Sequence, residues 1–156
     1  MYTGLLHLHN ALRWVVLILL IIMVIRSLAG RGGNRVWNEG DRKIALFLLI
    51  SCHLQLLIGL YQWMSGVWGL ALIQANGMAD TMKNSVSRFY AVEHFAGMLI
   101  AILLVTMAYS TTKRSIGDQE KYNKIFWMYS IALCLILALI PWAFREGIGR
   151  AWFPGM

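Results

Sequence analysis

Apolar residues dominate four long stretches of the chain, and short polar segments separate them. Each stretch is close to the roughly 20 residues that a helix needs to cross the hydrocarbon core of a bilayer. The pattern predicts an all-α fold, a four-helix transmembrane bundle with short loops, formed by a single integral membrane domain over residues 1–156. The expected spans are residues 5–29, 43–64, 88–110 and 123–144.

Residues 65–86 differ from the four stretches because polar and apolar side chains are mixed there. The apolar run within this segment, residues 67–73, is too short to cross a bilayer. We therefore expect an interfacial loop or a short amphipathic helix between spans two and three. Ser85 or Ser87 is the expected N-cap of the third span.

The composition excludes a soluble globular domain. Hydrophobic residues make up 59% of the chain and charged residues 13%, and the mean hydropathy is +0.61, values outside the range of soluble domains. In a soluble chain the net charge of +7 would suggest nucleic-acid binding, but here the basic residues lie between the apolar stretches, so no nucleic-acid partner is expected. Cys52 and Cys134 lie inside apolar segments without metal-ligand spacing, so neither a disulfide nor a zinc site is indicated.

Lysine and arginine are distributed unevenly between the two ends of the expected bundle. Basic residues are enriched in cytoplasmic loops, so the richer end should be cytoplasmic. That end carries Arg26, Arg31, Arg35, Arg42, Lys43, Lys113, Arg114, Lys121 and Lys124, and the other carries Arg13, Lys83, Arg88, Arg145 and Arg150. We expect an integral protein of a bacterial cytoplasmic membrane, with both termini on the outer side. The first span lacks a small-residue cleavage site, so we expect it to be retained.

Ionisable residues in three of the spans are the main indication of a functional site. Such groups are energetically costly in a bilayer and usually have a function. They lie in the outer half of the expected bundle or near its middle. They are His9 and Arg13 in the first span, His53 in the second, and Arg88, Glu93 and His94 in the third.

Three histidines on three helices suit haem iron, because two axial imidazoles must face each other across a flat ring. We expect His94 to pair with either His53 or His9. The cofactor would be haem b, and its anionic propionates would point outward. Arg13 and Arg88 are the expected partners of the propionates, because guanidinium groups bind carboxylates well.

Two glycines near the histidines have two interpretations. Gly59 and Gly97 remove side-chain bulk where a porphyrin could lie. Equally, they can serve close helix packing, with Gly97 in a stripe of small residues that includes Ala101 and Ala108. The residues alone do not distinguish these interpretations.

Other readings of the polar residues remain open. An ion pair between Arg13 and Glu93 would neutralise two charges within the bilayer. His53 can instead be a neutral imidazole that is hydrogen-bonded to a neighbouring helix, and His7 is expected at the membrane interface.

With four spans, histidines in the outer half and arginines beside them, the chain resembles the small four-helix membrane cytochromes b of the cytochrome b561 kind. The resemblance implies that paired histidines hold a haem and that electrons pass to or from a quinone or a small oxidant. The fourth span contains no histidine, which argues against two haems that are each held by two histidines.

Two alternatives belong to other functional classes. The short loops and the lack of a soluble catalytic domain also suit a non-enzymatic subunit of a larger membrane complex, or a homo-oligomer. A non-haem metal or proton site is the second alternative, because carboxylate and imidazole together suit iron, copper or zinc. Its expected ligands are His9, His53, Glu93 and His94.

Overall fold

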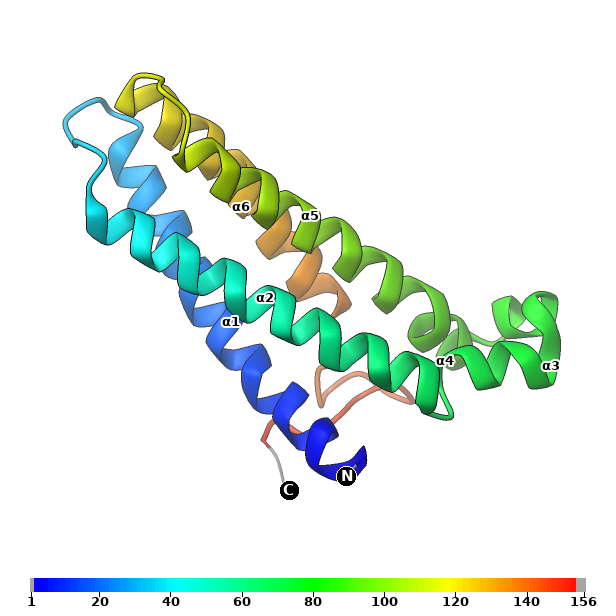
Figure 1. Ribbon diagram of the computed structural model, residues 1–156. Helices are drawn as coiled ribbons and strands as arrows, with labels where there is room; N and C mark the ends of the chain where they lie inside the picture. Colours follow the sequence, from blue (N-terminus) through cyan, green and yellow to red (C-terminus); the bar gives the residue numbers. More distant parts are fainter. Residues whose placement is uncertain (1, 154–156) are drawn as a thin grey trace.

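The computed structural model describes residues 2–153 and is entirely helical apart from its loops (Figure 1). The expectation of an all-α four-helix bundle is confirmed, and no strand occurs among the residues described. The third long helix is built from three consecutive parts, namely α4 (Ser85–Arg88), the π-helix η1 (Phe89–Glu93) and α5 (His94–Thr112). The elements are α1 (Tyr2–Gly30), α2 (Glu39–Ser65), α3 (Leu70–Lys83), α4 (Ser85–Arg88), η1 (Phe89–Glu93), α5 (His94–Thr112) and α6 (Asp118–Leu139).

Four of these helices are long and apolar enough to cross a membrane, by length and composition. Large hydrophobic side chains cover their outward faces. Ile18, Leu57, Leu103 and Ile131, one from each helix, are 48% to 63% exposed. Such exposure would be costly in water, whereas it fits contact with the acyl chains of a bilayer.

The four long helices surround a common apolar core. Helix α1 packs against α2 and α6, and α5 packs against the same two helices. Helices α1 and α5 therefore lie diagonally opposite each other across the bundle. The fully buried core side chains include Leu20, Met23, Leu48, Val105, Ile125 and Tyr129.

The bundle has two chemically different ends. One end, called the basic end here, carries the α1–α2 and α5–α6 loops, and the other, the terminal end, holds Tyr2 and Phe153 (Figure 1). This arrangement agrees with the expectation that both termini lie on one side. The side of the membrane on which they lie stays a prediction.

The last helix ends earlier than expected, at Leu139 and not at residue 144. Proline disfavours helical backbone angles in the residue before it. Ile140, which precedes Pro141, accordingly has extended angles, with φ −68° and ψ 132°. The chain then folds back over the terminal end as the C-terminal strap, residues 140–153 (Figure 1).

Side chains of α1 hold the C-terminal strap in place. Arg13 Nη2 and Trp14 Nε1 each donate a hydrogen bond of 2.9 Å to the carbonyl oxygen of Trp152. Asn10 Nδ2 donates to the carbonyl oxygen of Ala151 at 3.2 Å. The strap therefore closes the terminal end over the first helix.

The segment between spans two and three contains α3, which projects away from the bundle in Figure 1 and is broken at Gly77, where φ is 76° and the backbone is not helical. The expectation that this segment does not form a fifth span is confirmed, because α3 has 14 residues and is too short to cross a bilayer. The N-cap of the next helix is neither Ser85 nor Ser87. Asn84 takes this position, because its side-chain oxygen accepts a hydrogen bond of 3.0 Å from the amide of Ser87.

A buried carboxylate organises the basic end. Asp41 is fully buried and accepts hydrogen bonds from Arg26 at 2.6 Å and from Arg35 at 2.8 Å. Its second oxygen accepts a bond of 2.6 Å from the hydroxyl of Tyr122 in α6. With Asn38 it also forms the capping box that starts α2. One side chain thus ties the α1–α2 loop to two helices.

Candidate functional site

His94 is oriented by the end of α6. Its Nδ1 lies 2.7 Å from the carbonyl oxygen of Leu139. Because α6 stops at Leu139, this carbonyl has no partner within the helix and is free to accept. A carbonyl can only accept, so Nδ1 carries the proton and Nε2 keeps its lone pair. His94 therefore presents a basic nitrogen at its other edge.

A π-helical turn immediately precedes His94. The residues of η1 follow i→i+5 hydrogen bonding, and such turns within α-helices are frequently found at functional sites. The buried Phe89 ring begins this turn, and its centroid lies 5.9 Å from that of His94. The irregular turn and the imidazole thus form one local unit.

His9 lies on α1, where α2 approaches it closely. A Cβ atom at Gly59 would lie 3.1 Å from His9 Cε1, so the absence of a side chain on α2 lets the imidazole sit there. Gln55 Nε2 donates a hydrogen bond of 3.0 Å to the backbone oxygen of His9. Helix α2 therefore binds the main chain of His9 and leaves space for its ring.

His9 and His94 come from the diagonal helices α1 and α5, so they approach the bundle axis from opposite sides. His94 and Arg13 both lie close enough to His9 to interact with it electrostatically. The structure thus brings together three of the residues that the sequence singles out. This histidine pair lies inside the terminal end, beneath the C-terminal strap.

Several buried polar atoms at and around His9 have no hydrogen-bond partner. Among residues 2–153 there are six such side-chain atoms, and four of them lie here. Each costs about 1–3 kcal/mol if it stays unpaired, so the cluster favours a bound group or water at this position. The four are His9 Nδ1, Asn10 Oδ1, Arg13 Nε and Gln55 Oε1.

His53 does not join the pair. Its side chain is exposed on the outward face of α2, and its Nδ1 lies 2.9 Å from the carbonyl oxygen of Leu49 one turn earlier. Three histidines therefore do not converge, and of the two partners considered for His94 only His9 lies near it. His7 is exposed near the N-terminal end of α1, in keeping with an interfacial position.

The expected ion pair between Arg13 and Glu93 is wrong. Arg13 is 9% exposed and donates to the carbonyl oxygen of Trp152. Glu93 instead accepts a bond of 2.6 Å from Arg88 Nε. The wide π-helical turn explains why Glu93 pairs with Arg88, because it brings residues five positions apart onto one face.

The guanidinium of Arg88 therefore already has partners within the chain. Besides its ion pair with Glu93, its Nη1 donates to the carbonyl oxygen of Met82 at 3.1 Å. Both Arg88 and Glu93 line a cavity of about 350 Å³ at the terminal end. Arg13 is therefore the arginine with an unpartnered nitrogen beside the histidine pair.

The two glycines have different roles. Gly97 is buried against Leu139 of α6, and a Cβ atom at this position would overlap the leucine side chain. Ala101 and Ala108 continue the same buried face. Gly97 thus belongs to the small-residue stripe between α5 and α6, whereas Gly59 contacts His9.

The ligands expected for a non-haem metal are not gathered at one point. Glu93 is bound to Arg88, and His53 points outward. Within residues 2–153, no group of three or more histidine, cysteine, aspartate or glutamate side chains is arranged to hold a metal ion. Of the four expected ligands, only His9 and His94 therefore lie near each other.

No family model matches the chain, and neither the curated proteins nor the solved structures contain a match.

Proposed function

We propose that the chain is a membrane b-type haem protein for electron transfer, with His9 and His94 as the axial ligands. The observation that carries the proposal is the position of the two imidazoles on diagonally opposite helices, at the same end of the bundle. Ligands on both faces of a flat ring must come from opposite sides. The iron of a bound haem would supply reversible one-electron transfer.

The residues around the two imidazoles fit this assignment. Histidines that bind iron or other metals usually donate their second N–H to a carbonyl or carboxylate, which fixes the tautomer and makes the ligating nitrogen more basic. The bond from His94 Nδ1 to the Leu139 oxygen has this form. The unpartnered Nδ1 of His9 leaves that imidazole free to adjust its ring toward an incoming group.

Arg13 is the residue best placed to hold an anionic edge of the cofactor. It is near His9, is largely buried, and has an Nε without a partner. This Nε could donate to a propionate carboxylate, since guanidinium and carboxylate form strong paired hydrogen bonds. The bond from Arg13 to Trp152 meanwhile keeps the C-terminal strap over the site, which limits the access of water.

The absorption spectrum of protein that is purified in mild detergent from haem-replete cells tests the proposal. We expect a Soret band and a sharp reduced alpha band. His9→Ala and His94→Ala should each abolish the reduced alpha band, because each removes one axial ligand. His53→Ala and His7→Ala are matched controls that should retain it, because both side chains are exposed.

A colourless wild-type preparation would contradict the haem assignment, and a structural subunit of a larger complex would then be the better description. An unchanged spectrum in His9→Ala with loss in His53→Ala would keep haem but move the second ligand to α2. A quinone or small oxidant as the electron partner stays a prediction. Oxidation of the reduced protein by a soluble quinone analogue would test it.

A further inference from the structure

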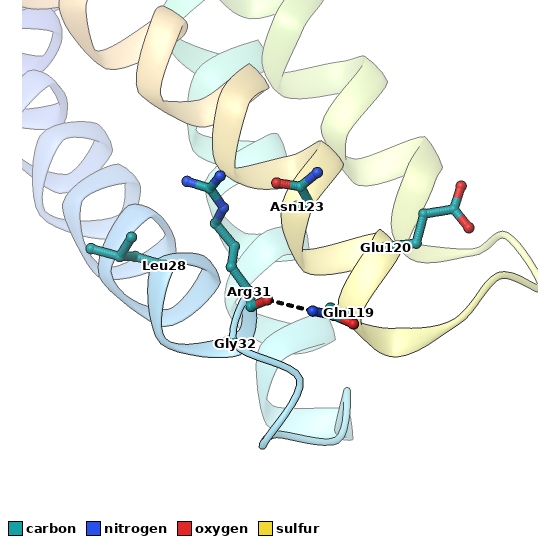
Figure 2. A pocket seen from close by; sticks show the side chains of 6 residues that line it. All are labelled: Leu28, Arg31, Gly32, Gln119, Glu120 and Asn123. Atoms are coloured by element: carbon teal, nitrogen blue, oxygen red, sulfur yellow. Dashed lines mark hydrogen bonds between the residues drawn. The ribbon is translucent and has the colours of Figure 1, made fainter.

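An open groove lies at the basic end, far from the histidine pair. It has a volume of about 600 Å³ and separates the end of α1 from the first turns of α6 (Figure 2). Its position makes it independent of the proposed haem site. The lining residues are Leu28, Arg31, Gly32, Gln119, Glu120 and Asn123.

Arg31 dominates the chemistry of this groove. Gln119 Nε2 donates a bond of 2.9 Å to its backbone oxygen, which fixes the start of the side chain. Figure 2 shows the side chain extending from the loop back along the helices, toward Asn123. Its guanidinium lies 4.4 Å from the ring centroid of Phe126 and 5.2 Å from that of Trp127. Two aromatic rings thus hold a cation in place.

This direction is unusual for an arginine at the end of a span. Such side chains normally turn outward, toward water and headgroups. Phe126 lies eight residues after Asp118, or about 12 Å along the helix from its first residue. The guanidinium of Arg31 therefore lies below the level of the loop, on the outward surface of the bundle beside the exposed Trp127 ring. Among residues 2–153, it has no carboxylate partner in an ion pair.

We propose that this groove binds the phosphate of an anionic phospholipid. The guanidinium of Arg31 would pair with the phosphate, and the side-chain amides of Gln119 and Asn123 supply polar contacts beside it. Leu28 and Trp127 are each 54% exposed next to the groove, on the side where acyl chains would lie. From the loop inward, the polar side chains, the guanidinium and the apolar side chains thus follow the order of headgroup, phosphate and acyl chain in a phospholipid.

The charge of the surrounding surface favours an anion. The basic end carries nine basic and four acidic residues, a net charge of +5. Of the acidic side chains, Asp41 is already bound by two arginines, and Glu120 accepts a bond of 2.6 Å from Lys124. Figure 2 shows the Glu120 carboxylate directed away from Arg31. Basic pockets between helices on the cytoplasmic side recognise anionic headgroups in this way.

Native mass spectrometry of the full-length protein in mild detergent tests the proposal, with phosphatidylglycerol and phosphatidylcholine added separately. We expect one tightly retained phosphatidylglycerol and no comparable retention of phosphatidylcholine. Arg31→Gln should weaken phosphatidylglycerol binding at least fivefold, the factor that corresponds to about 1 kcal/mol for one basic residue near an anionic surface. Arg114→Gln is the matched control, because it removes an exposed charge from the same end outside the groove.

Equal losses in the two variants would show that only the summed charge matters, which would overturn a specific site. Equal retention of the two lipids would overturn it too. Inorganic phosphate that displaces the lipid at low millimolar concentration would reassign the groove to free phosphate. If Arg31→Gln does not yield folded protein, Asn123→Leu keeps the stacked guanidinium and removes a polar wall. It should reduce lipid retention, and unchanged retention would again contradict the proposal.

Discussion

The carbonyl oxygen of Leu139, the last residue of α6, lies 2.7 Å from Nδ1 of His94 on the neighbouring helix. The bond depends on where α6 stops, because a continuing helix would occupy that carbonyl with an amide four residues later. Pro141 stops it. A helix end thus sets the tautomer of the proposed ligand.

Pro141→Ala should weaken the retention of haem by the protein. Without the proline, α6 can extend, and the Leu139 carbonyl can pair within the helix and no longer with His94. Loss of such a supporting bond typically lowers the affinity of a metal site 10- to 100-fold, which haem transfer to apomyoglobin would measure. Leu139→Ala retains the carbonyl and should keep the haem. Unchanged transfer rates in Pro141→Ala would disprove the coupling.

Asp41→Asn should be among the most destabilising polar substitutions in the chain. It leaves Arg26 and Arg35 without their buried partner, and breaking a buried ion pair costs about 3–5 kcal/mol. Unfolding in detergent–denaturant mixtures would measure the loss. The control is Asp80→Asn, since the ion pair of Asp80 with Lys83 is exposed and should contribute less than about 1 kcal/mol.

Arg13→Ala should loosen the C-terminal strap. The substitution removes a hydrogen bond to Trp152 and a cation stacked 5.2 Å from the Trp14 ring centroid. A bond from a charged donor contributes about 1.5–3 kcal/mol. Limited proteolysis after residue 140 should therefore be faster in Arg13→Ala than in Arg150→Ala.

A double-mutant cycle between Arg13 and Glu93 should show additive effects on stability, because the two side chains do not interact. Strong coupling between the two substitutions would instead support an ion pair between them.

Gly97→Ala should destabilise the α5–α6 interface by about 1–3 kcal/mol, because the added methyl group overlaps the Leu139 side chain. Leu139→Ala should relieve the clash, so the double variant should melt at a higher temperature than Gly97→Ala alone. Gly117→Ala is the control, since nothing lies within 4 Å of its Cβ position. If Gly97→Ala melted like the wild type, the close approach of the two helices would be wrong.

The orientation in the membrane can be tested by labelling in intact cells with an impermeant thiol reagent. Gly117→Cys in the α5–α6 loop should react only after the cells are opened, because the basic end is expected to be cytoplasmic. Asn76→Cys in α3 should react from outside. Cys134 is replaced by alanine first, since it is exposed. The reverse pattern would invert the topology and move the histidine pair to the inner half.

The periodicity and composition of the sequence determined the four spans, the absence of a fifth span between residues 65 and 86, and the placement of both termini at one end. These features depend on length and polarity, which can be read along the chain. Rotation of each helix about its own axis is different. A span that is apolar on all sides carries no stripe to mark its inward face. His53 therefore looked equivalent to His9 until packing turned one outward and the other toward the bundle axis.

The partners of the charged side chains likewise depended on tertiary structure. Arg13 and Glu93 are the expected pair by depth alone. In the folded chain, the π-helical turn brings Glu93 into an ion pair with Arg88. Arg13 instead donates to a backbone oxygen of the C-terminal strap. The contact between Asp41 and Tyr122 joins residues 81 positions apart. Hydrogen bonds need atoms within about 3 Å, and only the packed bundle brings such distant residues that close.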